Sequence, residues 1–357
     1  MLSSESSLRL DLLRFPLIVG VVFIHASAIK VGFSGGSVGL AQPVFWVDFI
    51  RNFISLIASL SVPVFFLMSG YLFFMNFNLS KNSYILKLKK RVETLLIPFL
   101  FWNLVAFTIT VTAQLIPATR QFFSGQHTLI TSFHSIFDYL NAIIGFTGPP
   151  VAYQLWFIRD LMIVVLLVPF INLIIKYVPL PFLGGMLALW IADFWPIYLP
   201  SSTALLFFSI GAYVASEKKD IFCLDRFGRV ITGLYFVILM IDVATMTQFP
   251  IPRLYQVGVL FGVMTVLFLT KMISRNETLK LWILRLNSAS FFVYATHEPL
   301  LTILRKISYK IFSPNSPIAI LSLYFSLPVI IIISMVIVYR LLNAISPRLL
   351  GVVTGGR

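Results

Sequence analysis

Runs of about 20 apolar residues recur along almost the whole chain, and they limit its fold more than any other feature. A helix of that length crosses the apolar core of a bilayer, and it pairs its own backbone polar groups where no water can reach them. The sequence therefore predicts an all-α fold, a polytopic membrane helix bundle. We expect ten spans, at about residues 10–30, 50–76, 92–115, 154–176, 180–196, 201–216, 229–247, 254–272, 287–308 and 317–342. The fifth and sixth of these are short.

The composition agrees with a membrane protein. Hydrophobic residues make up 59% of the 357 residues and charged residues 11%, and the mean hydropathy is +0.94. Soluble domains are far less apolar. No polar segment is long enough to form a separate soluble domain. We expect one membrane domain over residues 8–345, with short cytoplasmic tails at 1–7 and 346–357.

The net charge of +14 would suggest nucleic-acid binding in a soluble protein, but in a membrane protein the placement of the charges matters more. If the N-terminus is cytoplasmic, the basic clusters within 81–91, 218–229 and 271–285 all lie inside. This asymmetry favours cytoplasmic N- and C-termini and no nucleic-acid partner. Residues 115–153 form the only long outer loop in this arrangement. The last outer loop contains Arg305, Lys306 and Lys310, which we expect to anchor to lipid headgroups.

The sequence offers little for disulfide or metal chemistry. Cys223 is the only cysteine, so an intramolecular disulfide and a thiolate metal cluster are excluded. His127 and His134 lie in the long outer loop and lack partners at zinc-ligand spacing. We predict no metal site.

Two ionisable residues stand in the first apolar run, "LDLLRFPLIVGVVFIHAS". Arg14 and His25 are separated by 11 residues, about three helical turns, so they share one face at a separation of about 16 Å. An arginine at the centre of a membrane helix costs about 2.5–3.5 kcal/mol, and such residues usually face a cavity or a partner. In the alternative interpretation, Arg14 snorkels to the phosphates and His25 hydrogen-bonds a neighbouring helix.

Two further charged pairs lie in apolar runs. "LWFIRDLMIV" contains Arg159 and Asp160, and "FFVYATHEPLL" contains His297 and Glu298. Neighbouring residues on a helix point about 100° apart, so each side chain is expected to reach another helix. Two interpretations stay open for these four residues, a structural network or a role at the acceptor site.

Five segments, taken in order, resemble the acyltransferase-3 family of integral membrane O-acyltransferases. They are "LDLLRFPLIVGVVFIH", "VPVFFLMSGYLF", "KKRVETLLIPFLFW", "LWFIRDL" and "VYATHEPLL", and the resemblance runs from residue 8 to about 343. It implies transfer of an acyl group, with acetyl expected, from cytoplasmic acyl-CoA to a hydroxyl of a surface polysaccharide, a lipid-linked glycan or a related sugar. It also implies a bacterial-type inner (cytoplasmic) membrane.

The resemblance assigns roles to particular residues. His25 is expected to be the catalytic imidazole, with Arg14 as its partner for the anionic donor or the acyl group. Arg91 matches the basic position that opens the third span, but Thr94 stands where many members have a second arginine. The donor-binding residues implied in this way are Arg14 and Arg91, and we expect Lys87 and Lys90, beside Lys89, to replace the charge that is missing at Thr94.

These residue types suit acyl transfer. A neutral histidine, with a reference pKa of about 6.5, can take the proton of a hydroxyl at cellular pH. Arginine stays charged and can bind a phosphate or an oxyanion. Direct transfer and an acyl-histidine intermediate are both compatible with the two residues. The main alternative is a secondary transporter or a flippase of lipid-linked sugars, which would favour broken helices at matching positions in two repeats. The sequence shows no such repeat.

Overall fold

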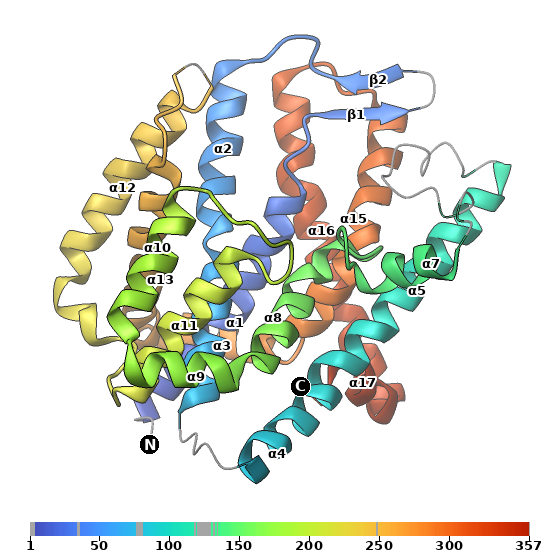
Figure 1. Ribbon diagram of the computed structural model, residues 1–357. Coiled ribbons are helices and arrows are strands. Elements are labelled where there is room, and N and C mark those ends of the chain that lie inside the picture. The colour runs from blue at the N-terminus through green and yellow to red at the C-terminus, as the bar shows by residue number, and fades with distance from the viewer. Residues whose placement is uncertain are drawn as a thin grey trace. The chain divides into compact units, whose positions relative to one another are not determined.

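A computed structural model describes residues 4–33, 36–75, 81–117, 119, 130, 133, 135–247 and 249–356 (Figure 1). The chain divides into two compact units, and both are discontinuous in sequence. The first unit comprises Met1–Val21, Asn52–Arg91 and Asp160–Ser290. The second unit comprises Val22–Arg51, Val92–Arg159 and Phe291–Arg357.

All the regular elements that the structure describes in the first unit are helices. It takes the N-terminal part of α1 (Ser4–His25) and the C-terminal parts of α2 (Phe45–Ser59) and α8 (Trp156–Leu166). Its other elements are α3 (Ser61–Phe74), α4 (Lys81–Arg91), α9 (Val168–Tyr177), α10 (Pro179–Ile191), α11 (Ser202–Ser216), the 3₁₀ turn η4 (Cys223–Phe227), α12 (Gly228–Thr245), α13 (Leu254–Arg275) and α14 (Glu277–Asn287).

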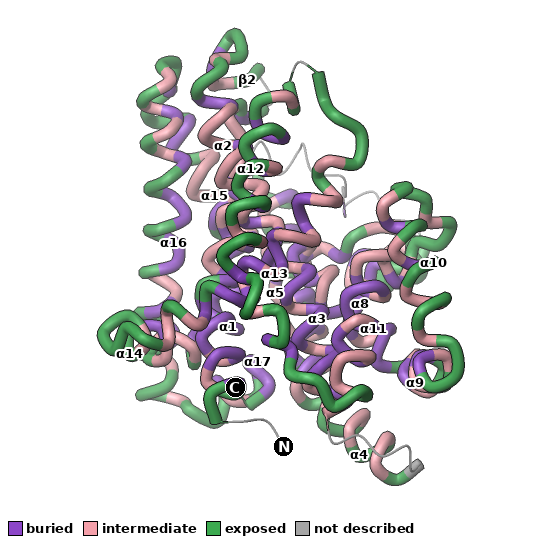
Figure 2. The backbone as a smooth tube through the Cα atoms, turned by 90° about the vertical axis from the view of Figure 1, so that its left-hand side faces the viewer, coloured by how far each residue is buried: buried purple, intermediate pink, exposed green. Residues whose placement is uncertain are grey.

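Helices α3 and α11 form the closely packed centre of the first unit, and both are largely buried (Figure 2). A Cβ atom on Gly70 would collide with the carbonyl of Phe208, and one on Gly211 would collide with that of Leu67. Small residues let membrane helices approach to this distance. Gly70 and Gly211 therefore allow the close packing of α3 against α11.

The second unit contains the remaining parts of α1, α2 and α8 and a short antiparallel hairpin. In the hairpin, β1 (Lys30–Phe33) pairs with β2 (Gly36–Gly39), with Lys30 opposite Gly39. The other elements are the π-helical turn η1 (Val92–Leu96), α5 (Ile97–Leu115), α7 (Ile136–Ile144), the 3₁₀ turn η3 (Tyr153–Leu155), α15 (Ser290–Phe312), α16 (Pro317–Ile345) and α17 (Pro347–Thr354).

Among the described residues, five helical stretches are long and apolar enough to cross a membrane, which makes this a multi-pass membrane protein. They are Phe45–Phe74, Asn82–Leu115, Cys223–Thr245, Leu254–Arg275 and Pro317–Ile345. A sixth arises if the bent pair Tyr153–Leu166 and Val168–Tyr177 is one span. The all-α class is confirmed, but the count of ten spans is not.

The other predicted spans differ from these in length or charge. Helices α10 and α11, with 13 and 15 residues, are short, as the sequence predicted. Helices α1 and α15 have 22 and 23 residues. Their lengths suffice for a span, but Arg9, Asp11 and Arg14 interrupt the apolar character of α1.

The first predicted span extends too far at its C-terminal end. Helix α1 ends at His25, whereas the sequence analysis continued the helix to residue 30. The residues after Ile29 belong to the hairpin, whose Gly36 and Gly39 have φ angles of 135° and 141°. Only glycine adopts such angles readily, so these two residues favour the hairpin. The chain therefore leaves the helical conformation before β1 begins at Lys30. His25 is therefore the last residue of α1 and does not lie just past its centre.

Proline breaks two of the predicted spans. The predicted span over 154–176 is not one straight helix. It consists of α8 and α9, which meet at an angle of 61°. Pro169 has no N–H for the carbonyl of Val165, and the Tyr84 hydroxyl donates to that carbonyl at 3.3 Å. Helices α2 and α3 are separated at Leu60, and Pro63 has no N–H for the carbonyl of Ser59.

Two helices lie where the sequence suggested no regular structure. Helix α7 lies in the predicted outer loop at 115–153, and its cap residue Ser135 accepts a hydrogen bond from the backbone N–H of Asp138. Much of that loop, with His127 and His134, lies outside the described residues. Helix α17 lies in the predicted tail, and the Trp102 indole donates to the carbonyl of Val353 at 2.9 Å.

Candidate functional site

The end of α1 and the residues after it are held by three side-chain donors from α2 and α15. Arg305 Nη1 donates to the carbonyl of His25 at 2.9 Å. Arg51 Nη1 donates to that of Ser27 at 3.2 Å, and the Tyr309 hydroxyl to that of Ala28 at 3.4 Å. The last carbonyls of a helix have no partner within it, and positive charge is favourable there. Arg51 also forms an ion pair with Asp48 at 3.0 Å.

The imidazole of His25 lies among other ring side chains of the same unit. Its centroid is 4.9 Å from that of Tyr153, with the rings nearly perpendicular, and 5.3 Å from that of His297. Tyr153 belongs to η3 and His297 to α15, so three separate segments meet at His25. Sequence reasoning had named both histidines but not their proximity, and it had missed Tyr153.

A kink in α15 shapes the surroundings of His297. Pro299 lies inside the helix, and Glu298 before it has extended backbone angles, φ −109° and ψ 141°. A residue that precedes proline is pushed into this region by steric clash. Pro299 also leaves the carbonyl of Ala295 without its helical partner. The buried side-chain amide of Gln154 donates to the carbonyls of Ala295 at 3.1 Å and Glu298 at 3.0 Å. It thus provides a hydrogen bond to the carbonyl that Pro299 leaves without a helical partner.

His297 is fully buried and has one ring nitrogen in use. Its Nδ1 lies 2.8 Å from the carbonyl oxygen of Tyr294. A carbonyl only accepts, so Nδ1 carries the proton and Nε2 of the neutral ring keeps a lone pair. Among the described residues, Nε2 has no hydrogen-bond partner. A buried acceptor without a partner is costly, which marks this atom as a candidate contact for a ligand.

The next turns of α15 place a carboxylate and a guanidinium beside the two histidines. Glu298 accepts hydrogen bonds from the backbone N–H of Thr302 at 3.3 Å and from its hydroxyl at 3.1 Å, and a side-chain hydrogen bond joins it to Tyr153. Arg305 Nη2 donates to Thr302 Oγ1 at 3.3 Å, while its Nε is buried without a partner among the described residues. We call this group the histidine cluster: His25, Tyr153, His297, Glu298 and Arg305.

The position of Arg305 corrects the sequence analysis. It lies within α15 and not in an outer loop, and its guanidinium is hydrogen-bonded inside the second unit. Headgroup anchoring is therefore the wrong interpretation for this residue. The spacing of Glu298, Thr302 and Arg305 on one helical face was visible in the sequence and signals such a side-chain network.

The pair Arg159 and Asp160 separates toward different partners. The buried Arg159 guanidinium donates to the carbonyls of Gly145 and Gly148, at 2.8 Å for the latter, in the turn that follows α7. Asp160 accepts from the backbone N–H of Ser201, the cap residue of α11, at 2.8 Å. These contacts fit a structural network, one of the two interpretations left open for the pair.

The residues predicted to bind the donor lie in the first unit. Lys87 donates to the carbonyl of Phe73, and the Phe73 ring lies 4.8 Å from Lys87 Nζ and 5.9 Å from the guanidinium carbon of Arg91. Lys90, in the next position before Arg91, is exposed. The half-exposed side chain of Arg14 forms an ion pair with Asp11 at 3.1 Å. Lys87 and Arg91 therefore lie close together on one face of α4.

Sequence reasoning missed Arg9, a buried arginine of the first unit. Arg9 Nε donates to Thr270 Oγ1 at 2.8 Å, and Nη1 and Nη2 donate to the carboxylate of Asp225 at 2.6 and 3.1 Å. Nη2 also donates to the carbonyl of Leu267 at 2.9 Å, and the guanidinium lies 3.7 Å from the centre of the Phe222 ring. We call this group the Arg9 cluster. Its partners are more than 200 residues away in sequence, so no local sequence pattern predicts this cluster.

Within the described ranges, no group of three or more histidine, cysteine or acidic residues has the geometry to hold a metal ion.

Comparisons with known proteins agree with the resemblance seen in the sequence. The sequence profile of a family described as "Acyltransferase domain", the acyltransferase-3 family, matches residues 7–339. The succinoglycan biosynthesis protein ExoH of Rhizobium meliloti is 27% identical over 366 residues, which cover 100% of this chain and 94% of that protein. No solved structure matches significantly.

Proposed function

The chain belongs to the acyltransferase-3 family, and from that premise we propose that it is an integral membrane O-acyltransferase. It transfers an acyl group, with acetyl expected, from acyl-CoA to a hydroxyl of a polysaccharide, a lipid-linked glycan or a related sugar. The observation that carries this proposal is the histidine cluster, in which an imidazole, a carboxylate and a guanidinium meet. The similarity to a protein named for succinoglycan biosynthesis supports a glycan acceptor.

His25 acts as the base in this proposal. It takes the proton of the acceptor hydroxyl as the oxygen attacks the thioester carbonyl. The bond between carbon and sulfur then breaks, and the imidazolium returns the proton to the thiolate of coenzyme A. In the alternative route, His25 first takes the acyl group itself and passes it to the hydroxyl. Both routes need the ring held at the end of α1, where Arg305 bonds its backbone carbonyl.

The donor binds through cations of the first unit in this proposal. Arg14, Arg91, Lys87 and Lys90 provide positive charge for the phosphates of coenzyme A. Lys87 and Arg91 both lie near the Phe73 ring, which supports their acting together. The chain then functions as one membrane domain over 8–345, in an inner membrane with both termini cytoplasmic.

A transfer assay separates this proposal from a secondary transporter or a flippase of lipid-linked sugars. Inverted membrane vesicles of a polysaccharide-producing host, with and without the chain, are given acetyl-CoA labelled in the acetyl group. The proposal expects chain-dependent label in lipid-linked or polysaccharide material, which is released by mild alkali as an ester is. Sugar translocation without transfer of label would support the transporter and contradict the transferase.

A further inference from the structure

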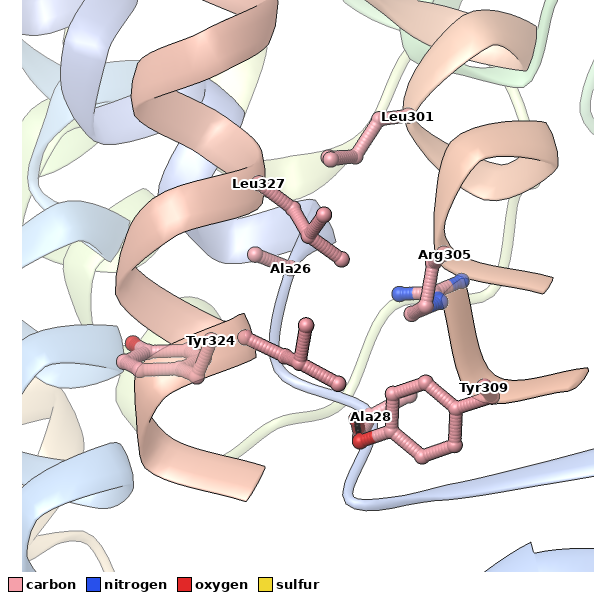
Figure 3. Close-up of a pocket in the computed structure, with 8 residues that line it drawn as sticks. Ala26, Ala28, Leu301, Arg305, Tyr309, Tyr324 and Leu327 are labelled. Carbon is pink, nitrogen blue, oxygen red and sulfur yellow. Dashed lines mark hydrogen bonds between the residues drawn. The ribbon is translucent and has the colours of Figure 1, made fainter. Parts of the chain in front are cut away.

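A small pocket lies beside the histidine cluster in the second unit. It is lined by Ala26, which directly follows His25, by Leu301 and Arg305 of α15, and by Leu327 of α16. Figure 3 shows the Arg305 side chain directed toward the space between α15 and α16. The cavity volume is about 10 Å³, which is about the volume needed for one water-sized sphere. Its walls are mostly aliphatic.

Arg305, which lines this pocket, has an incompletely satisfied guanidinium. Arg305 uses Nη1 for the carbonyl of His25 and Nη2 for Thr302, but its buried Nε has no acceptor among the described residues. A buried N–H that lacks a partner indicates a missing acceptor, such as a carbonyl oxygen of a ligand. The pocket thus combines a lining guanidinium whose Nε lacks an acceptor among the described residues with a space of about 10 Å³ between mostly aliphatic side chains and the rings of Tyr309 and Tyr324.

We propose that this pocket is the acyl subsite of the enzyme and that it restricts the donor to short acyl groups. The inference rests on the proposed acyl transfer and adds the identity of the transferred group. Arg305 Nε donates to the carbonyl oxygen, and the terminal methyl lies against Leu301 and Leu327. An acetyl group has the carbonyl and the single methyl that the site accommodates, and a butyryl chain has two methylene groups too many.

The same contact strengthens during the reaction. When the acceptor oxygen bonds to the carbonyl carbon, the carbonyl oxygen becomes negative, and the guanidinium stabilises it more than it stabilises the neutral thioester. The C–S bond then breaks, with the electron pair leaving on sulfur. Glu298 and Lys306 are charged groups near Arg305. Glu298 is hydrogen-bonded to Thr302 and Tyr153.

The test compares acetyl-CoA, propionyl-CoA and butyryl-CoA, each labelled in the acyl group, in the vesicle assay with the full chain. Leu327→Ala and Leu301→Ala enlarge the pocket from two different helices. Leu321→Ala is the matched control, because Leu321 lies on α16 but packs against the cluster of Leu40, Val47 and Ile320. Protein amount and thermal stability are measured for each variant.

The wild type and Leu321→Ala are expected to prefer acetyl over butyryl by about tenfold or more, since one methylene changes selectivity by about 10–200-fold in an apolar pocket. In Leu327→Ala or Leu301→Ala the ratio of butyryl to acetyl transfer should rise by about tenfold. Equal use of acetyl and butyryl by the wild type, or an unchanged ratio in the folded pocket variants, would overturn the acyl subsite and leave the proposed transferase intact. Wild-type vesicles that transfer none of the three acyl groups would overturn the proposed function itself.

Discussion

Two arginines, one in each unit, sit in buried polar clusters but differ in how their hydrogen bonds are used. Arg9 in the first unit bonds through all three nitrogens, and its charge is matched by a bidentate contact with Asp225. Arg305 in the second unit bonds a backbone carbonyl and a hydroxyl and leaves Nε without a partner among the described residues. The first arrangement is complete without a ligand, and the second is not.

This difference separates structural anchoring from a binding role. A buried ion pair with full hydrogen bonding ties together the segments that provide it, and removal of one partner leaves a charge in an apolar interior. A preorganised donor without an acceptor costs stability but is ready to stabilise charge that develops on a substrate. We therefore propose that the Arg9 cluster serves the fold and that the histidine cluster serves the reaction.

The largest effect is expected for His25→Gln. Glutamine keeps much of the volume and the hydrogen-bonding capacity of the ring but cannot act as the base, so acyl transfer should fall by about 10² to 10⁴. The measurement is the rate of label transfer in vesicles, normalised to the amount of folded protein.

The comparison variant for this prediction is His297→Gln, which changes a second member of the histidine cluster. This variant removes the neighbouring buried imidazole and tests whether the two histidines have separate roles. Near-normal transfer by a folded His25→Gln protein would show that His25 serves packing alone, even though the family assignment would stand.

The next effect in size is expected for Arg305→Gln, with a loss of about 10² to 10³ in kcat from the missing donor to the developing oxyanion. Arg305→Lys keeps the charge but loses the planar fork, so it should retain more activity than Arg305→Gln. Detergent stability should change little in either variant. A loss of folded protein that accounts for the whole loss of activity would assign Arg305 to the same structural role as Arg9.

The complementary change is Arg9→Gln, which should act on stability and not on catalysis. It leaves the Asp225 carboxylate without its bidentate partner, and breaking a buried pair costs about 3–5 kcal/mol of folding free energy. The midpoint of thermal inactivation should fall, while kcat per folded molecule stays near wild type. A reduced kcat at unchanged stability would contradict the division between the two clusters.

The fold was predictable wherever it depended on local apolar runs and on proline. The lengths of α13 and α16 follow from uninterrupted apolar sequence, and the break before α3 follows from Pro63. The end of α1 was predicted too late, because "ASAIKV" is apolar enough to continue a helix, and the hairpin that stops it depends on Gly36 and Gly39 pairing with β1.

The candidate site was predictable only as single residues. Sequence spacing pointed to His25 and His297 separately, but their contact depends on packing between α1 and α15. The role of Arg305 in the site could have been predicted from its spacing with Glu298 on one helix. It was missed, because basic residues near a predicted loop were assigned to lipid headgroups. The ion pair of Arg9 with Asp225 could not be predicted from the sequence, since the two residues are 216 positions apart.

The smallest effect is expected at the proposed donor site of the first unit, where Arg91→Ala should raise the KM for acetyl-CoA severalfold and leave kcat nearly unchanged. Contacts between exposed cations and phosphates are screened by salt, so the wild-type KM should rise with ionic strength and that of Arg91→Ala should rise less. Steady-state rates at several salt concentrations measure both effects, with Lys280→Ala as the control, because Lys280 already pairs with Glu277 at 2.6 Å on the separate helix α14. A KM that responds neither to Arg91→Ala nor to salt would move the donor site away from α4. Other cationic residues would then have to bind the phosphates of coenzyme A, whereas the proposed roles of His25 and Arg305 would stand unchanged.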